Sequence, residues 1–400
     1  MSANKNQTDY DVIIVGGGLA GLSLSCLLGK IDGLRVACID RDAPKDQLAS
    51  DERTTAISYG SAQILTRAGV WDDLQKGGCP IENIEILDGN SPLLLQFLSD
   101  EVEGKAFGWI ISNHHIRTVL MQHMKNMSVD HIAPARVKDF AVSEGSATVI
   151  LDDDKELTAK LIVGADGRGS SLREYMDVPV RGWNYNQRAV VCFISHEFPH
   201  HNKAVEHFWP AGPFANLPMN DTEDGRHRSS LVFTEHGKKR GGSLMNLTDE
   251  EFLAEVQERF PDSYGRVEVI NNMRKAYPLS LSHAAEYISP RMVLVADAAH
   301  GIHPIAGQGL NLGFRDLGCL ATLIEDAVAR NADIGADELL QSYQRKRRPD
   351  NMAMVAVTDG LVRLFSNDLP PVKLLRRFGL RAVSKLKPAK KFFMHRAMGE

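Results

Sequence analysis

A glycine-rich turn between two short apolar segments constrains the fold of this chain more than any other feature. The segment Tyr10–Val15 is mostly apolar, which is typical of a parallel strand buried on both faces. It is followed by Gly16–Gly21, with the sequence GGGLAG, and then by the small and apolar residues of Leu22–Lys30, which predict a helix. A second apolar segment, Leu34–Ile39, predicts another strand and ends at Asp40. This order of strand, GxGxxG turn, helix and strand predicts a βαβ unit that binds a dinucleotide.

Each residue of this motif has a physical reason for its position. Gly16 permits the tight turn, Gly18 allows a pyrophosphate to approach the backbone, and Gly21 allows the helix to pack closely on the strand. Asp40 lies 19 positions after Gly21 and can accept hydrogen bonds from ribose hydroxyls. We place the neighbouring Arg41 in the same site. The motif does not distinguish NAD from FAD.

Two later segments repeat the pattern of a strand that leads through a glycine-containing turn into a helix. In Leu161–Arg173, LIVGADGRGSSLR, Asp166 follows the strand at the end where open α/β sheets bind ligands, although an Asp that only starts a helix would look the same. In Asp297–Asp316, DAAHGIHPIAGQGLNLGFRD, four glycines follow the apolar strand Met292–Ala296 and precede a helix that continues through Leu317–Arg330. Such a turn aims backbone N–H groups at a ligand.

Two arginines are candidates for contact with a cofactor. Arg53 lies in the segment DERTTAIS, and Arg117 lies in the predicted amphipathic helix Ile110–Met127. For each, a solvated arginine is the alternative interpretation. No side chain stands out as a catalytic acid or base, and we interpret His300 and His303 as structural residues of the late glycine-rich turn.

The middle of the chain has a different pattern. Residues 180–276 alternate polar and apolar side chains, which predicts a separate and mostly antiparallel sheet domain for the substrate. Thr248 and Glu251 predict a capping box at the start of a helix. Further on, Leu339–Arg363 predicts a helix that is interrupted near Pro349. The predicted strands are Gln187–His196, Ala204–Phe208 and Arg228–Thr234, with two more around a turn within Ile81–Leu98.

Charge, cysteine content and hydropathy argue against several classes of protein. The net charge of −5 argues against a protein that binds nucleic acid. Five cysteines without CxxC spacing fit a reducing compartment and do not indicate a metal site. No segment resembles a signal peptide, and no run of about 18 apolar residues is present, so we expect a cytoplasmic protein without a transmembrane helix.

The C-terminal segment departs from this acidic balance. After Pro371 it contains nine basic residues and a single acidic one, Glu400, with apolar residues interleaved. This pattern predicts a helix that binds a membrane surface, here the inner membrane, or a protein partner. A solvated terminal helix is the alternative interpretation.

Three segments together resemble a known family. GGGLAGLS at 16–23, GADG at 164–167 and the sequence 297–316 are similar, in the same order, to the three fingerprints of class A flavoprotein monooxygenases, the para-hydroxybenzoate-hydroxylase-like group. HPIAGQGLNLG, together with the early DERTTAIS, most resembles the ubiquinone-biosynthesis hydroxylases that act on polyprenylated phenols. The resemblance implies an α/β fold with a Rossmann-like FAD-binding domain, a mostly antiparallel β-sheet substrate domain and a C-terminal helical region. The expected domains are residues 1–75, 102–179 and 276–365 for FAD, 76–101 and 180–275 for the substrate, and 366–400 for the basic helical tail.

The resemblance also assigns roles to individual residues. The first glycine motif and Asp40 would hold the ADP half of FAD, Val137 would contact adenine through its backbone, and Asp166 would lie in the motif that is linked to both FAD and NAD(P)H. Asp297 would contact the ribityl and pyrophosphate region, but it follows Ala296 where the family usually has glycine. Because a methyl group is small, we expect FAD to bind with at most a slightly shifted strand end. The remaining assignments are Arg53 and Arg117 near the cofactor, and Pro304, Gly307, Gln308, Gly309, Leu310 and Asn311 along the flavin ring.

The family implies a hydroxylation that uses NAD(P)H and O2. NAD(P)H would reduce non-covalently bound FAD, and the reduced flavin would react with O2 to give a C4a-hydroperoxide. This species would transfer oxygen to the aromatic ring of a polyprenylated phenol. Two alternatives stay open: a flavin hydroxylase of a small soluble phenol, and a non-catalytic flavoprotein that joins a ubiquinone-biosynthesis complex through the basic tail.

Overall fold

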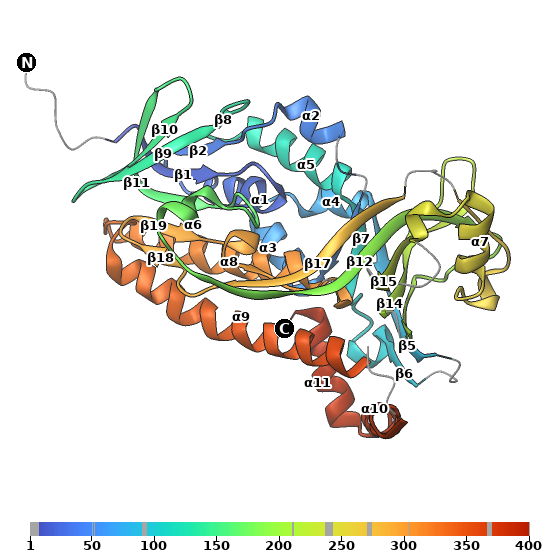
Figure 1. Ribbon diagram of the computed structural model, residues 1–400. Coiled ribbons are helices and arrows are strands. Elements are labelled where there is room, and N and C mark those ends of the chain that lie inside the picture. The colour runs from blue at the N-terminus through green and yellow to red at the C-terminus, as the bar shows by residue number, and fades with distance from the viewer. Residues whose placement is uncertain are drawn as a thin grey trace, which may run out of the picture.

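Two large β-sheets and a small three-stranded sheet form the framework of the molecule (Figure 1). The computed structural model describes residues 8–49, 51, 53–89, 94–209, 212–236, 243–269, 274–303, 305–365 and 370–399. The mixture of a largely parallel sheet, a largely antiparallel sheet and C-terminal helices confirms the predicted fold class.

The eight-stranded sheet contains the predicted βαβ unit. β1 pairs in parallel with β2 on one side and with β11 on the other, and β11 pairs in parallel with β19. The carboxyl ends of parallel strands meet at one edge of a sheet, so Gly16, Asp40, Ala165 and Val295 come together there. The strands of this sheet are β1 (Tyr10–Val15), β2 (Val36–Ile39), β8 (Val129–Ile132), β9 (Val137–Val142), β10 (Ala147–Leu151), β11 (Glu156–Gly164), β18 (Ile288–Ser289) and β19 (Met292–Leu294).

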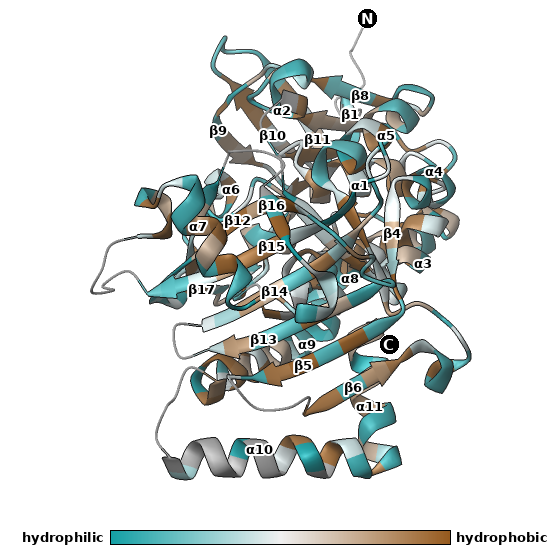
Figure 2. Cartoon of the chain, turned by 90° about the vertical axis from the view of Figure 1, so that its right-hand side faces the viewer, coloured by the Kyte–Doolittle hydropathy of each residue, from teal (hydrophilic) through white to brown (hydrophobic). Residues whose placement is uncertain are grey.

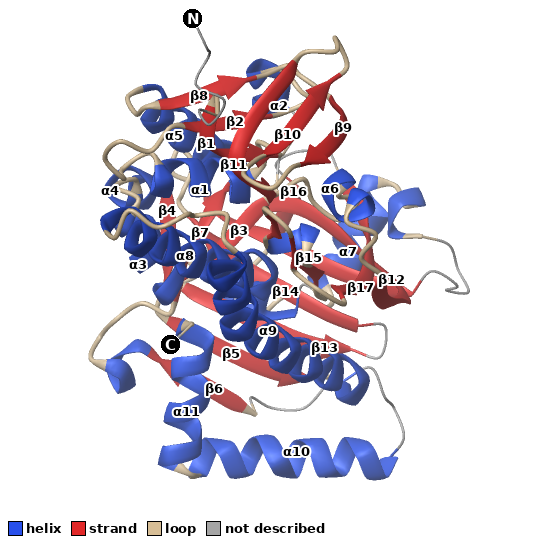
Figure 3. Cartoon of the chain, turned by 90° about the vertical axis from the view of Figure 1, so that its left-hand side faces the viewer, coloured by secondary structure: helices blue, strands red, loops and turns tan. Residues whose placement is uncertain are grey.

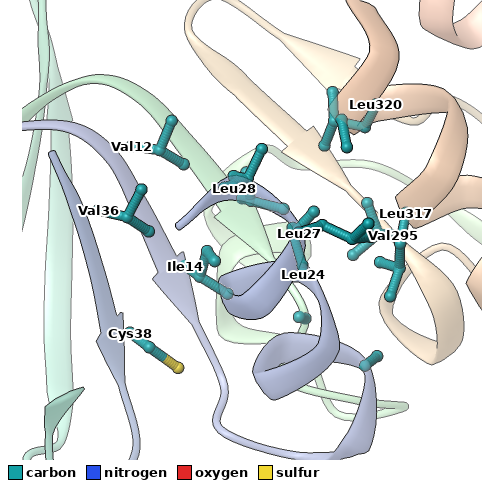
Figure 4. Packing of buried hydrophobic residues seen from close by; sticks show 14 of the residues in the cluster. Val12, Ile14, Leu24, Leu27, Leu28, Val36, Cys38, Val295, Leu317 and Leu320 are labelled. Carbon is teal, nitrogen blue, oxygen red and sulfur yellow. The ribbon is translucent and has the colours of Figure 1, made fainter. Parts of the chain in front are cut away.

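The main hydrophobic core lies between this sheet and two helices, α1 (Leu19–Leu28) and α8 (Gln308–Ala329). Figure 4 shows side chains of α1 between those of β1 and β2 on one side and those of α8 on the other. Leu24, Leu28 and Leu317 are fully buried, and each such side chain stabilises the fold by about 1.5–3 kcal/mol. This core therefore fixes α8, and the glycine-rich turn before it, against the first βαβ unit.

The nine-stranded sheet is built around two long strands, β12 and β17, which run from the first sheet to the far end of the molecule (Figure 1). β17 pairs with β12 along most of its length and with β20 at its end, so this sheet continues past residue 275 and reaches the late glycine-rich turn. Its strands are β5 (Asn83–Asp88), β6 (Leu95–Leu98), β12 (Val180–His196), β13 (Lys203–Trp209), β14 (Gly212–Met219), β15 (His227–His236), β16 (Val267–Val269), β17 (Lys275–Ala284) and β20 (His300–Gly301).

The small sheet contacts both halves of the molecule and corrects one prediction. Its strand β7 (Gly108–Ser112) contains the first residues of the segment predicted as the helix Ile110–Met127. The helix, α5, begins only at Asn113, where the Ser112 side chain accepts a hydrogen bond from the His115 N–H and caps it. The other strands are β3 (Thr54–Ser58) and β4 (Gly78–Ile81), and the shorter helices nearby and beyond are α2 (Pro44–Ala49), α3 (Tyr59–Arg67), α4 (Trp71–Lys76), α5 (Asn113–Lys125), α6 (Ser171–Tyr175) and α7 (Asp249–Gln257).

Two predictions about helices have opposite outcomes. The capping box of Thr248 and Glu251 is present at the start of α7 and is confirmed. The predicted interruption near Pro349 is wrong, because α9 (Asp337–Phe365) runs through the proline for 29 residues (Figure 3). A proline inside a helix costs about 3 kcal/mol, but side chains next to it, Arg347 and Asn351, are held in a buried hydrogen-bond network that offsets the cost.

The C-terminal helices α10 (Pro370–Lys385) and α11 (Lys387–Met398) pack on the edge of the nine-stranded sheet (Figure 2). Met394 and Met398 are buried in the same cluster as sheet residues such as Phe97. Arg376 forms a buried ion pair with Asp88 of β5, so the alternative of a solvated terminal helix is wrong for this part of the tail. No helix in the described part of the chain is both long enough and apolar enough to cross a membrane.

Candidate cofactor and reaction site

The first glycine-rich turn is tight at two positions and open at a third. Gly16 has φ +108°, and a Cβ there would lie 2.5 Å from the Ala165 carbonyl oxygen. A Cβ at Gly21 would lie 1.8 Å from the Gly16 carbonyl oxygen, so only glycine fits at either position. At Gly18, by contrast, a Cβ would meet no atom of the described residues within 4 Å. The turn is thus closed against its own chain and open where a phosphate would approach.

Asp40 holds the turn from the neighbouring strand. Its Oδ2 accepts a hydrogen bond from the Gly17 N–H at 2.5 Å, and its Oδ1 accepts one from the Asp42 N–H at 2.8 Å. Its carbonyl oxygen accepts a hydrogen bond from the Ala135 N–H at 2.7 Å, which brings the segment before Val137 to the same edge. Arg41 is exposed, and its Nε lies 3.4 Å from Asp42.

Arg117 is not a surface arginine. It reaches from α5 to the glycine turn, where its Nη1 donates hydrogen bonds to the Gly17 carbonyl oxygen at 3.1 Å and to Gln47 at 3.2 Å. Its Nε is buried and has no hydrogen-bond partner among the described residues. Burial lowers the pKa of Arg117 from its usual value. A buried cation with a free donor beside a phosphate-binding turn is the arrangement that an anion would satisfy.

Arg53 is anchored by a carboxylate rather than solvated alone. Its guanidinium makes two hydrogen bonds of 2.8 Å to the two oxygens of Asp51, and it lies over the Tyr277 ring at 5.0 Å. The hydrogen bonds that Arg53 donates to Asp51 raise the pKa of Arg53. Asp51 also accepts a hydrogen bond of 2.9 Å from Asn113, at the start of α5. Arg53 therefore stands in a fixed position between β3 and the nine-stranded sheet.

Asp166 serves as a helix cap and keeps one oxygen free. Its Oδ2 accepts hydrogen bonds from the N–H and the hydroxyl of Ser171, at 2.7 and 2.9 Å, in the first turn of α6. Its Oδ1 is buried and has no partner among the described residues. Asp166 thus supports the first turn of α6, and its free oxygen can still accept a hydrogen bond from a ligand, so its role in binding the cofactor stays a prediction.

Asp297 lies beyond β19, on the turn that follows the apolar strand. Its side chain is half exposed and lies 3.6 Å from the Nε of Arg168. Ala296, which precedes it, has φ +51°, in the left-handed region that favours glycine. A Cβ at Gly313 of α8 would lie 2.8 Å from the Ala296 Cβ. The absence of a side chain at Gly313 therefore makes room for the methyl group at Ala296.

A buried carboxylate that sequence reasoning missed holds this turn in place. Asp316 is fully buried and accepts hydrogen bonds from His300 Nε2 at 2.5 Å, Arg347 Nε at 2.8 Å, Asn351 Nδ2 at 3.1 Å and the Ala296 N–H at 3.1 Å. Burial alone would raise the pKa of Asp316, but His300 and Arg347 hold it at about 2. The only signal in the sequence was that Asp316 ends the late glycine-rich motif. Its role could not be predicted, because its partners on α9 are more than 30 residues away in the chain.

The residues expected along the flavin ring form the entrance to α8. Gly307 has φ +64°, and the first turn of the helix after it has no side-chain cap, so its N–H groups point outward without that partner. Asn311 accepts a hydrogen bond from the Ser58 N–H at 2.9 Å and donates to the carbonyl oxygens of Ala56 and Gly307 at 2.8 and 2.9 Å. A Cβ at Gly309 would meet no atom of the described chain within 4 Å.

The other residues expected along the flavin ring differ in their exposure to solvent. Gln308 is buried, and Leu310 is partly buried. Pro304 lies outside the described residues. His303 is buried, and burial lowers its pKa to about 4, so it is neutral at pH 7. His300 donates a hydrogen bond to Asp316, and the Nδ1 of His303 accepts one from the Ile305 N–H at 3.2 Å. The Nε2 of His303 is buried without a partner among the described residues, so the purely structural role of His303 stays a prediction.

These observations fit FAD. Gly18 and Gly309 are open positions, and three buried polar atoms of the site residues, Arg117 Nε, Asp166 Oδ1 and His303 Nε2, have no hydrogen-bond partner among the described residues. A dinucleotide with an anionic centre and a polar ring at one end would meet groups of matching chemistry at these positions.

Comparisons with known proteins give the same assignment. The family described as the FAD binding domain matches residues 9–358. The chain is 42% identical to the ubiquinone hydroxylase UbiL of Rhodospirillum rubrum over 97% of this chain and 89% of that protein. It is 32% identical to the mitochondrial ubiquinone biosynthesis monooxygenase COQ6 of Xenopus tropicalis, over 96% and 92% of the two chains.

Solved structures confirm the fold. The crystal structure of p-nitrophenol 4-monooxygenase PnpA from Pseudomonas putida superimposes with a TM-score of 0.79 over 97% of this chain and 98% of that one, at 20% identity. A similarity at this identity supports the architecture alone. Taken with the family match and the relatives above, it shows that the chain belongs to the FAD binding domain family, among the FAD-dependent monooxygenases that include the ubiquinone hydroxylases.

Proposed function

We propose that this protein hydroxylates the aromatic ring of a polyprenylated phenol in ubiquinone biosynthesis, with FAD as cofactor and NAD(P)H and O2 as co-substrates. The observation that carries the proposal is the late glycine-rich turn. Its Gly309 is open, the helix after it starts without a side-chain cap, and its Ile305 packs in one apolar cluster with Phe208 of the nine-stranded sheet. The relatives named ubiquinone hydroxylase and ubiquinone biosynthesis monooxygenase support the substrate class.

In this proposal the expected residues divide the cofactor between them. Gly16, Gly18, Gly21, Asp40 and Arg41 hold the ADP half, with the backbone at Val137 beside adenine. Arg53, Arg117, Asp166 and Asp297 surround the central part, and the segment from Pro304 to Asn311 lines the ring. Bound FAD supplies the reaction with O2 and the transfer of one oxygen atom. In this proposal the N–H groups at the uncapped start of α8 stabilise negative charge on the ring.

The inner surface of the nine-stranded sheet suits an apolar substrate. A cluster of buried apolar residues from the sheet, the small sheet and the tail lies next to the Ala56 and Ile305 side of the site. In this proposal the prenyl chain lies against this apolar region, which favours such a chain over a small hydrophilic phenol. The residues of this cluster include Ile81, Leu95, Phe97, Phe107, Ile110, Met219, Met394 and Met398.

The experiment is a chain-length series. The purified protein, with its flavin, is given NAD(P)H and phenols that carry no prenyl unit, one unit or several, and hydroxylated products are measured by mass spectrometry. We expect the ratio of product formed to NAD(P)H consumed to rise with chain length. Equal coupling with an unprenylated phenol would favour the small-phenol alternative, and a protein that oxidises no NAD(P)H and forms no product would favour the non-catalytic one. The phenol that accumulates in cells without the protein then identifies the step.

We further propose that the tail attaches the protein peripherally to an anionic membrane surface. Leu386, which lies between the two C-terminal helices, and Phe392 and Phe393 of α11 are exposed. Exposed basic residues, namely Arg381, Lys385, Lys387, Lys391 and Arg396, lie on the same helices. Exposed aromatic side chains among cations are the composition of a helix that lies in a lipid interface.

Point substitutions test this better than deletion, because removal of the tail would also uncover Met394 and Met398. The doubly substituted Phe392→Ser, Phe393→Ser protein should lose sedimentation with vesicles that contain anionic lipid, while Val142→Ser, an exposed apolar position on the β9 hairpin, should not. Binding to neutral and anionic vesicles alike would argue against the role of the basic residues. If no vesicle is bound but a protein of the pathway is, the tail is a protein-binding segment.

A further inference from the structure

Glu206 lies on the inner face of the nine-stranded sheet, between two apolar clusters. Along β13, side chains alternate between the two faces, so Ala204, Glu206 and Phe208 share one face. Ala204 belongs to the cluster that includes the tail methionines, and Phe208 belongs to a cluster with Ile305 of the late glycine-rich turn. Glu206 therefore lies between two apolar clusters, one of which includes Ile305 of the late glycine-rich turn.

The neighbours of Glu206 across the sheet are apolar. It is in register with Ile86 of β5 on one side and with Ala215 of β14 on the other. Ile86 packs against both apolar clusters, which places Glu206 where the two meet. The side chain keeps part of its surface accessible, and burial raises the pKa of its carboxyl to about 7.

Glu206 differs from the other acidic residues of this sheet in having no partner. Asp88 is paired with Arg376, Glu235 with Arg188, and Glu85, on the opposite face, with Lys203. Glu206 makes no hydrogen bond or ion pair with any residue that the structure describes. A carboxylate held among apolar side chains without a donor is costly, and a ligand that brings a hydroxyl group removes that cost.

We propose that Glu206 accepts a hydrogen bond from the ring hydroxyl of the phenolic substrate and takes up its proton during the reaction. The inference rests on the proposed function, since it requires a phenol in this site. The phenolic O–H bond breaks, an O–H bond forms on the carboxylate, and the electron pair stays on the phenolic oxygen, where it makes the ring more electron-rich. The proton returns to that oxygen before the product leaves, so the step involves no net change in oxidation state or charge.

The experiment compares the binding of two probes that differ by one proton donor. A 2-prenylphenol and its methyl ether are titrated into the flavin-containing protein, and dissociation constants are taken from the change in the visible spectrum of the oxidised flavin. Above pH 8 the wild type should prefer the phenol by about 10-fold to 100-fold, as expected for a hydrogen bond to a charged acceptor. Below pH 6 the carboxyl is protonated and can donate to either probe, so the preference should fall.

Glu206→Gln has the same shape but does not ionise, so its preference for the phenol should be smaller and should no longer change with pH. Glu206→Leu should lose the preference altogether. Glu85→Gln is the matched control, because Glu85 lies on the neighbouring strand with its side chain on the opposite face. In turnover, the Glu206→Gln protein should keep NAD(P)H oxidation but lose most of the hydroxylated product.

The outcomes separate the two proposals. If the wild type binds both probes but Glu206→Gln shows the same pH-dependent preference, the role of Glu206 is wrong and the proposed function stands. If the wild type binds the phenol and its ether equally at every pH, the hydrogen bond is likewise excluded. If the flavin-containing wild type binds neither probe and forms no product with any phenol, both proposals are wrong.

Discussion

Asp316 and Glu206 are acidic residues of two different regions, and they are in opposite electrostatic states. Asp316, beneath the late glycine-rich turn, accepts four hydrogen bonds and has a pKa of about 2. Glu206, on the inner face of the nine-stranded sheet, has no partner among the described residues and has a pKa of about 7. Burial raises the pKa of a carboxyl in both regions, so it is the presence or absence of donors in the protein that decides the outcome. The Asp316 carboxylate finds its hydrogen-bond donors within the protein, whereas the Glu206 carboxylate finds none among the described residues.

The largest expected effect comes from removing the buried charge of Asp316. Asp316→Ala removes the fully buried carboxylate shared by Arg347 and His300 and leaves Arg347 with only the partly exposed Asp350 as an anionic partner. We expect a loss of about 3–5 kcal/mol in the free energy of unfolding, measured by denaturant titration. Asp350→Ala is the matched control, because Asp350 contacts the same guanidinium at 2.8 Å from a partly exposed position. Its cost should stay below about 1 kcal/mol. Equal losses in the two variants would show that the buried network has no special role.

Gly21 and Gly18 allow the same comparison in the first glycine-rich turn, because Gly21 is closely packed against the protein and Gly18 is open. Gly21→Ala places a methyl group against the Gly16 carbonyl oxygen and should destabilise the protein without FAD by about 3 kcal/mol. Gly18→Ala meets no described atom, so the melting temperature without FAD should stay within about 2 °C of the wild type. Its dissociation constant for FAD, measured by flavin fluorescence, should rise at least about 10-fold, since the methyl group faces the phosphate. Tight FAD binding by Gly18→Ala would refute the open phosphate position.

The pH dependence of stability should separate the two acids. The pKa of Asp316 is depressed, so its stabilisation is complete above about pH 4 and is lost as the pH falls toward 2. The Asp316→Asn protein should lack this acid-dependent loss, which is on the order of 2 kcal/mol. The pKa of Glu206 is raised, so its effect has the opposite sign, and the protein loses stability as the pH rises from about 4.5 toward 7. Urea unfolding at a series of pH values should show this second loss in the wild type and not in Glu206→Gln.

The smallest expected effect concerns Ala296 and Gly313. Gly313→Ala should cost about 1–3 kcal/mol, because its methyl group would lie 2.8 Å from the Ala296 Cβ. In the Ala296→Gly background that contact is gone, and the same substitution should cost at least about 1 kcal/mol less. Ala296→Gly alone should change stability by under about 1 kcal/mol, because relief of the positive φ is offset by the greater freedom of glycine when unfolded. Additive effects in the double variant would mean that the two positions do not contact each other.

The sequence predicted those features whose causes are local. The strand Tyr10–Val15 has the predicted bounds, and the capping box at Thr248 depends only on residues three apart. The predicted strands of the middle region are present in β12, β13 and β15, each somewhat longer than expected. In the candidate site, the glycine positions and Asp166 lie at the sheet edge where the pattern placed them. Whether each of those residues contacts FAD stays a prediction.

The features that could not be predicted depend on distant parts of the chain. β14 (Gly212–Met219) contains Pro213 and Pro218, which disfavour strands, and it forms because β13 and β15 lie on either side of it. The continuation of α9 through Pro349 depends on contacts with Asp316, which no local pattern shows. The isolation of Glu206 becomes visible only when β5, β13 and β14 are brought together.

Strands that lie side by side in the eight-stranded sheet are synthesised at widely separated times. β1 and β11 are made early, but the strand that pairs with the far side of β11, β19, begins only at Met292, after nearly all of the nine-stranded sheet has been made. Asp316 must then wait for Arg347 and Asn351 of α9. On the ribosome, most of the nine-stranded sheet can therefore assemble before the late glycine-rich turn is held in place. Until the last hundred residues emerge, the nascent protein holds an exposed sheet edge at β11, and this is the stage at which a chaperone would protect it.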